Sequence, residues 1–170
     1  EGVLLMELIV DADGHPAPQL HELTLTSAQA REYHHRLLAE VVRMLCVGLI
    51  HGDLSEFNIL VDAQGPVIID LPQAVNAAAN NSARAMLERD VANMTAYFGR
   101  FAPELLTTDY GQEIWALYRH GNLSPDIELT GYVERSAIAA GIEEVMRVID
   151  DAREEAVARH ARTLHALAMA

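Results

Sequence analysis

Residues 49–61 read Leu-Ile-His-Gly-Asp-Leu-Ser-Glu-Phe-Asn-Ile-Leu-Val, and residues 67–70 read Val-Ile-Ile-Asp. Two short runs rich in β-branched residues flank residues 62–65, Asp-Ala-Gln-Gly, a pattern that predicts a β-hairpin. Asp53 and Asn58 lie before the first run, and Asp70 ends the second. We therefore expect the hairpin to bring Asp53, Asn58 and Asp70 to one face.

The order and spacing of these three side chains suit phosphoryl transfer. In that chemistry one carboxylate accepts or orients the attacking hydroxyl, while an amide oxygen and a second carboxylate hold magnesium against the phosphates. Three such residues alone are a weak signal, but the flanking strands and the order His-Gly-Asp-Leu-x-x-x-Asn strengthen it. The pattern predicts a magnesium-dependent phosphotransfer site.

These residues resemble the RIO family of atypical protein kinases, specifically its C-terminal lobe. In that family a segment like residues 51–58 is the catalytic loop, and a strand like residues 68–70, followed by a short tail ending in Gln, here Gln73, binds the metal. A third matching block is residues 87–93, Leu-Glu-Arg-Asp-Val-Ala-Asn. The three blocks cover the middle of the chain, and the C-terminal third resembles no family that we can name.

The resemblance implies a role for each matching residue. It makes Asp53 the catalytic aspartate and makes Asn58 and Asp70 the metal ligands, and it implies that Asp70 could also act in catalysis by carrying a transient acyl phosphate. His51 is expected to brace the loop backbone, and Asp90 to accept hydrogen bonds from its N–H groups. The expected nucleotide-binding residues are Met6, Glu7, Ile9, Ser55, Glu56, Leu60 and Ile69.

The expected fold class is α+β and mainly helical, with a protein-kinase-like C-terminal lobe that carries a small catalytic β-hairpin. Residues 1–10 resemble the last strand of an N-terminal lobe and the hinge, with Met6 as gatekeeper. Periodicity alone would favour an ordinary strand there, and the downstream blocks reverse that interpretation. Residues 11–170 would form the C-lobe, with 134–170 as a C-terminal helical extension.

Helices are expected on both sides of the hairpin. Thr26 and Gln29 form a capping box, and apolar residues then recur at helical spacing until Gly48. Residues 76–82, rich in Asn and Ala, are expected to form a linker. Further helices are predicted at residues 83–98, after Pro103, at 108–120 and within 134–170.

Three histidines and two acids outside the hairpin are expected to be free of metal. His34 and His35 are adjacent on a helix, where side chains diverge by about 100 degrees, so we expect both to lie partly solvated on the surface. The loop containing Asp11, Asp13 and His15 lacks the further oxygen ligands of a calcium loop, so we expect a solvated connection.

The composition of the chain limits the kinds of partner that it is expected to bind. A chain of 170 residues that is 51% hydrophobic can bury one core, and its formal net charge of -13 argues against direct binding to duplex nucleic acid. The single cysteine, Cys46, excludes an intrachain disulfide and a cysteine-based zinc cluster. No apolar run approaches the length of a membrane span and no signal peptide is evident, so we expect a cytoplasmic protein.

The sequence contains no Lys, and all 12 basic residues are Arg. Kinases hold the nucleotide phosphates with a strand lysine paired to a helix glutamate, and cover them with a Gly-rich loop. Because this sequence contains neither, we expect the chain alone to be incomplete for catalysis and to need a separate N-terminal lobe.

The sequence is compatible with three functions. The favoured one is an ATP- and Mg²⁺-dependent (or Mn²⁺-dependent) serine/threonine protein kinase or ATPase with a protein substrate. A small-molecule kinase of the aminoglycoside or homoserine phosphotransferase type has a similar His-Gly-Asp-Leu loop, although Ser55 and residues 71–73, Leu-Pro-Gln, depart from its usual pattern. A nucleotide-dependent scaffold that assembles with a large partner, such as a pre-ribosomal particle, is the alternative outside the enzymes.

Overall fold

Three α-helices and four short strands make up the computed structural model, which describes residues 7–132. The helices are α1 (Ser27–Cys46), α2 (Ala83–Gly99) and α3 (Tyr110–Arg119), and short 3₁₀ helices η1 (Leu20–Glu22) and η2 (Pro103–Thr107) precede α1 and α3. The fold is α+β, as predicted. The predicted helical extension at residues 134–170 lies outside the described residues.

Helix α1 begins where the capping box predicts. The hydroxyl of Thr26 accepts a hydrogen bond from the N–H of Gln29 at 3.2 Å, and the Gln29 side chain accepts one from the N–H of Thr26 at 3.0 Å. These two bonds satisfy N–H groups that a helix start leaves without partners. The buried residues of α1 recur at helical spacing: Ala30, His34, Leu37, Leu38, Val41, Val42 and Leu45.

The predicted hairpin is present. Strand β2 (Ile59–Val61) pairs antiparallel with β3 (Pro66–Ile68), and Ile59 lies opposite Ile68. Asp62 closes the turn, because its carboxylate accepts hydrogen bonds from the N–H groups of Gln64 and Gly65 at 2.6 and 2.9 Å. The hairpin therefore starts directly after Asn58 and ends two residues before Asp70.

A second strand pair was not predicted. Strand β1 (Leu49–Ile50) pairs antiparallel with β4 (Val75–Asn76), so the expected linker at 76–82 begins inside a strand. The N–H of Ala77 adds a hydrogen bond to the carbonyl of Gly48 at 2.8 Å. Two-residue strands have no periodicity to read, and only the folded chain brings these distant segments together.

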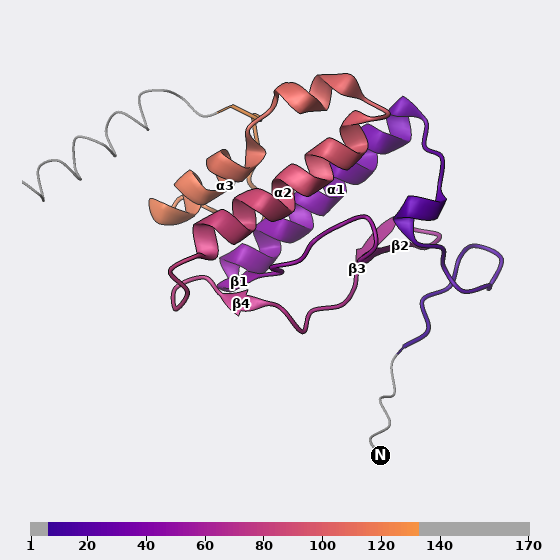
Figure 1. The fold of residues 1–170 in the computed structure, drawn as a ribbon, viewed down its shortest axis with the longest axis horizontal. Coiled ribbons are helices and arrows are strands. Elements are labelled where there is room, and N and C mark those ends of the chain that lie inside the picture. The colour runs from indigo at the N-terminus through magenta and orange to yellow at the C-terminus, as the bar shows by residue number, and fades with distance from the viewer. Residues whose placement is uncertain (1–6, 133–170) are drawn as a thin grey trace, which may run out of the picture. The chain divides into compact units, whose positions relative to one another are not determined.

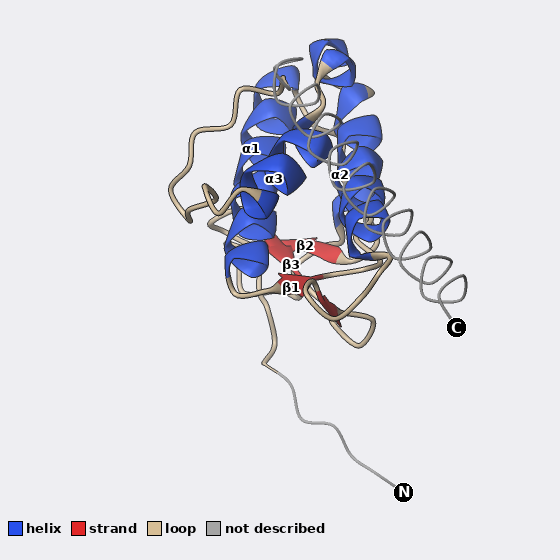
Figure 2. Ribbon diagram, turned by 90° about the vertical axis from the view of Figure 1, so that its left-hand side faces the viewer, coloured by secondary structure: helices blue, strands red, loops and turns tan. Residues whose placement is uncertain are grey.

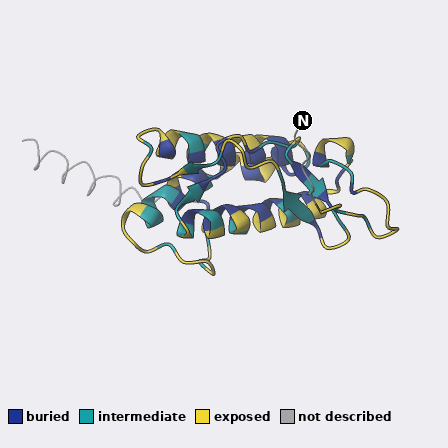
Figure 3. Cartoon of the chain, turned by 90° about the horizontal axis from the view of Figure 1, so that it is seen from below, coloured by how far each residue is buried: buried dark blue, intermediate teal, exposed yellow. Residues whose placement is uncertain are grey.

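Helices α1 and α2 run side by side in opposite directions, and α3 packs beside α2 (Figure 1). Turned by 90°, the same fold has its helices on one side of the strands (Figure 2). The buried faces of the helices are turned inward (Figure 3). The hydroxyl of Tyr97, near the end of α2, donates to the carbonyl of Leu20 at 2.8 Å and ties η1 to this helical layer.

The expectation that His34 lies on the surface is wrong. Its side chain is only 2% exposed, its Nε2 lies 3.1 Å from the hydroxyl oxygen of Thr95, and its ring contacts those of Phe98 and Tyr110. Burial, aided by the neighbouring His35, lowers the pKa of His34 to about 4. Because α1 packs against both α2 and α3, its buried face is wide enough to include this histidine; His35 is exposed, as predicted.

Between residues 7 and 132, no helix has both the length and the apolar character required to cross a bilayer.

Candidate active site

Helix α2 holds the loop at residues 51–58 through a buried carboxylate. Asp90 is 1% exposed, and its two oxygens accept hydrogen bonds from the N–H groups of Gly52 at 2.7 Å and Leu54 at 3.2 Å. Burial raises the pKa of Asp90, while these two N–H groups act in the opposite direction. One side chain thereby fixes the backbone on both sides of Asp53.

Two neighbours of Asp90 hold the carbonyls of the same residues. The Arg89 guanidinium donates to the carbonyl of Gly52, and the Asn93 amide donates to the carbonyl of Leu54 at 3.2 Å. Arg89, Asp90 and Asn93 are spaced so that one face of α2 reaches the loop. Gly52 and Leu54 thus have both backbone polar groups bonded to helix side chains.

His51 connects the loop to the segment before Asp70. It is 2% exposed, its Nδ1 accepts a hydrogen bond from the N–H of Asp53 at 3.3 Å, and its Nε2 lies 3.0 Å from the carbonyl oxygen of Ile69. Since a backbone N–H can only donate, Nδ1 is the acceptor and Nε2 bears the proton. The ring therefore connects Ile69, the residue before Asp70, to Asp53.

Asn58 closes the loop from its other end. Its side-chain amide donates to the carbonyl of Asp53 at 2.8 Å, and its own carbonyl accepts the N–H of Ile69 at 3.0 Å. Because the Asn58 amide N–H donates to the loop backbone, the Asn58 amide oxygen is the atom available to a metal. Together with the His51 bridge, these bonds join Asp53, Asn58 and Ile69 in one network.

Asp70 has an unusual backbone. Its φ is 67°, and among residues 7–132 it is the one residue other than glycine with a positive φ. Left-handed backbone costs energy for an L-residue, although Asp tolerates it better than most, and such strain tends to occur at functional sites. The Asp53 and Asp70 side chains are both exposed, so both carboxylates can reach a ligand.

The other residues expected at the nucleotide site divide into two groups. Ser55 and Glu56 lie on the loop, Leu60 lies on β2, and Ile69 follows β3 and belongs to the bonded network. Glu7 and Ile9 belong to the N-terminal segment, where the carbonyl of Ile9 accepts the N–H of Ala17 at 2.9 Å, and no hydrogen bond of the described residues joins this segment to residues 51–58. Met6 lies outside the described residues.

Three contacts of the loop were not predicted from the sequence, those made by Arg89, Asn93 and Gln73. The roles of Arg89 and Asn93 could have been read from the matching block at residues 87–93, because their spacing places them beside Asp90 on a helix. The contact of Gln73 with Asp53, whose Oδ2 lies 3.4 Å from the Gln73 Nε2, depends on a turn and had no periodic signal.

Two surface clefts lie apart from these residues. One, of 370 Å³, is lined by parts of α2, η2 and α3, and the other, of 420 Å³, lies between α1 and the hairpin turn. Asp53, Asn58 and Asp70 line neither cleft.

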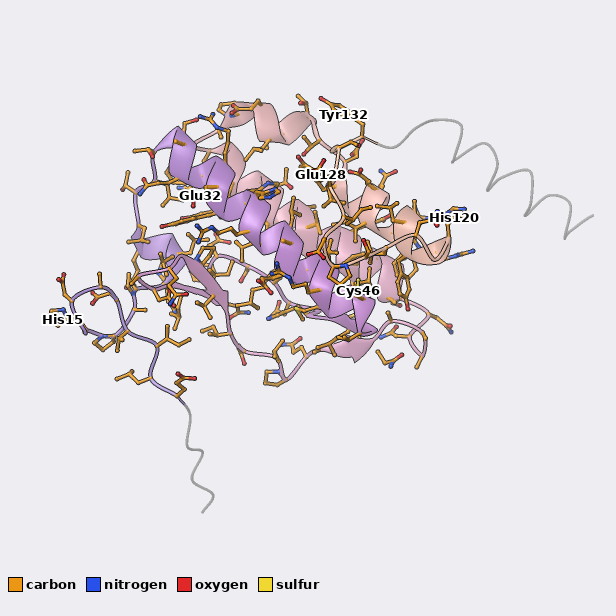
Figure 4. The ribbon with its side chains drawn as sticks, turned by 180° about the vertical axis from the view of Figure 1, so that it is seen from behind. His15, Glu32, Cys46, His120, Glu128 and Tyr132 are labelled. Carbon is orange, nitrogen blue, oxygen red and sulfur yellow. The ribbon has the colours of Figure 1, made fainter. Side chains whose placement is uncertain are left out.

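Asp11, Asp13 and His15 also bring potential ligand atoms within 4.8 Å of one another. Figure 4 shows His15 on a loop that projects away from the helices. One Asp11 oxygen already accepts the N–H groups of Asp13 and His15, each at 2.9 Å, so this carboxylate shapes the turn.

The described residues form an α+β domain in which α2 bonds the backbone of an Asp-bearing loop, and a second Asp follows two residues after the hairpin. This arrangement is compatible with the kinase-like lobe that the sequence predicts. The family model of the RIO domain matches residues 1–111. The chain therefore belongs to the RIO domain family, which confirms the resemblance.

Similar curated proteins are named as kinases. The RIO-type serine/threonine-protein kinase Rio2 of Methanocaldococcus jannaschii is 40% identical over 78 residues, which cover 45% of this chain and 28% of that protein. The serine/threonine-protein kinase RIO1 of Homo sapiens is 36% identical over 106 residues, covering 62% and 18%. The Rio1 kinase of Haloferax volcanii is 38% identical over 103 residues, covering 58% and 32%. The matched region thus spans less than a third of each of these relatives.

Proposed function

We propose that this chain is the C-terminal lobe of an ATP- and Mg²⁺-dependent phosphotransferase of the serine/threonine protein kinase type. The observation that supports it best is the hydrogen-bonded network of His51, Asp53, Asn58 and Ile69. This network joins the loop that bears Asp53 to Ile69, the residue directly before Asp70. The names of the relatives support the same reaction class.

Each residue has a distinct task in this proposal. Asp53 accepts a hydrogen bond from the attacking hydroxyl and orients it toward the γ-phosphate. The amide oxygen of Asn58 and the carboxylate of Asp70 would hold Mg²⁺, since hard oxygen ligands are those that magnesium prefers. When bound, the metal neutralises charge on the phosphates.

The hydrogen bonds between α2 and the loop support accurate positioning of Asp53. Bonds from Arg89, Asp90 and Asn93 fix the backbone beside Asp53, and a positioned carboxylate needs no reorganisation during the reaction. Ser55, Glu56, Leu60 and Ile69 would contact the nucleotide from the loop and hairpin.

The sequence contains no Lys. The group that holds the nucleotide phosphates therefore has to come from another part of the protein. We propose that a second, N-terminal lobe supplies the lysine and covers the nucleotide, with residues 1–10, including Met6, Glu7 and Ile9, as the connecting strand and hinge. The term two-lobed protein below means this chain together with that lobe.

The test is magnesium-dependent phosphotransfer by the two-lobed protein and its variants Asp53→Asn and Asp70→Asn. We expect each substitution to lower turnover by at least about a hundredfold. The melting temperature should stay unchanged, because both side chains are exposed. Asp126→Asn, at an exposed position after α3, is the matched control and should keep full activity. Full activity of either site variant would contradict the proposal.

The same assay separates the alternatives by product. Phosphorylated protein supports the protein kinase, and a phosphorylated metabolite supports a small-molecule kinase. Slow release of phosphate without a phosphorylated acceptor supports an ATPase that acts as a nucleotide-dependent scaffold.

A further inference from the structure

The chain folds back sharply after Asp70. The left-handed backbone at Asp70 turns the chain, and the N–H of Ala74 then donates to the carbonyl of Leu71 at 2.9 Å. Pro72 occupies the second position of this four-residue turn, where its fixed φ is favoured. The turn is short, so Gln73 is returned toward the loop at residues 51–58.

Two separate observations place Gln73 against that loop. A Cβ added at Gly52 would come within 2.8 Å of the Gln73 carbonyl oxygen, so the two backbones are in close contact. The side-chain amide nitrogen of Gln73 lies 3.4 Å from Oδ2 of Asp53. Hydrogen bonds at active sites are often long without substrate and shorten in the reacting complex, so this length fits a working contact.

We propose that Gln73 is a positioning residue that orients the carboxylate of Asp53. Its amide donates to Oδ2, which leaves Oδ1 to accept the hydrogen bond of the attacking hydroxyl. The inference rests on the proposed function. It adds a connection between two site residues, because the tail at residues 71–73 connects the position of Asp70 to the orientation of Asp53.

The chemistry of the side chain suits this task. A neutral amide can fix one oxygen of a carboxylate without adding a charge, whereas Arg or Lys would form an ion pair that competes with the substrate hydroxyl for the same carboxylate. The Gln73 side chain is exposed, so its contact with Asp53 contributes little to folding.

Kinetics of the two-lobed protein test the inference through Gln73→Leu and Gln73→Glu. Leu removes the donor at nearly the same size, and Glu replaces it with a second carboxylate. We expect Gln73→Leu to lower kcat about tenfold and to leave the KM for ATP within about twofold of wild type. Gln73→Glu should lower kcat further, because like charges repel. Gln112→Leu and Gln112→Glu, at an exposed position on α3, are the matched controls.

A double substitution separates positioning from a merely structural role. In the Asp53→Asn background, Gln73→Leu should cause no further loss of kcat, because the group that it orients is already disabled. An unchanged kcat for Gln73→Leu, an additive loss in the double variant, or a raised KM with a lowered melting temperature would overturn the inference.

A measurement on the chain itself separates failure of this inference from failure of the proposed function. Asp53→Asn should shift the NMR signals of the Gln73 side-chain amide, and unshifted signals would refute the contact whatever the activity. If wild type is active and Asp53→Asn is not, but the Gln73 variants match wild type, the inference alone fails. If Asp53→Asn keeps full activity, the proposed function fails.

Discussion

Asp90 makes two hydrogen bonds to the loop backbone from a site that water barely reaches. Its role was expected from the resemblance, because residues 87–93 match a family block. The buried position of His34 was not expected, because its neighbour His35 is just as polar and only the packing of α1 decides which of the two is covered. The burial of a single residue can therefore be predicted where a sequence motif determines it. It cannot be predicted where tertiary packing alone determines which residue is covered.

Asp90→Asn tests the importance of that carboxylate. The substitution replaces one oxygen by an NH₂ group that faces a backbone N–H, so one buried donor loses its acceptor. We expect a loss of about 2 kcal/mol in the free energy of unfolding. Urea denaturation measures it, with Asp126→Asn, at an exposed site, expected to stay within about 0.5 kcal/mol of wild type. Equal stability of the two variants would contradict the role of Asp90.

At the scale of elements, local signals predict the hairpin and the three helices. The Asp- and Gly-containing turn between β2 and β3, and the capping box of α1, each depend on residues within a few positions of one another. The β1–β4 pair and the contact of Gln73 with Asp53 join segments that are distant in the chain, for which a single sequence gives no local signal.

Gly52→Ala tests how closely the loop and the tail at residues 71–73 approach each other. Gly52 has a φ of 83°, and an added Cβ would lie 2.7 Å from Met86 and 2.8 Å from Gln73. Gly14 has a φ of 81° with nothing within 4 Å, so Gly14→Ala has the backbone cost without the clash. We expect Gly14→Ala to cost about 1 kcal/mol and Gly52→Ala about 2 kcal/mol more, as measured by thermal and urea unfolding. Equal losses of stability in the two variants would show that Gly52 and the tail at residues 71–73 are not in close contact.

At the scale of the whole molecule, His34 makes stability depend on pH. It lies where α1, α2 and α3 meet, as its contacts with Thr95, Phe98 and Tyr110 show. Its pKa is about 4 in the folded chain against 6.5 as the ordinary value, so the unfolded chain binds more protons between these pH values. The folded state therefore loses stability as the pH falls from 6.5 through 4.

The expected loss from His34 is about 2 kcal/mol between pH 7 and pH 4.5. Acidic groups titrate in the same range, so the comparison is with His34→Gln, which can still bond the Thr95 hydroxyl but does not titrate. Urea unfolding at both pH values should show a smaller loss in His34→Gln than in wild type. The same loss in both proteins would mean that His34 is not responsible.

In the proposed function, Asn58 and Asp70 form one metal–nucleotide site beside Asp53. Paramagnetic broadening of backbone NMR signals by Mn²⁺ with ATP tests it most directly. We expect broadening at residues 58 and 70 in wild type, its loss in Asp70→Asn, and its retention in Asp13→Asn, which alters only the cluster of ligand atoms at residues 11–15. Broadening confined to that cluster, with sharp signals at residues 58 and 70, would contradict a metal site at Asn58 and Asp70.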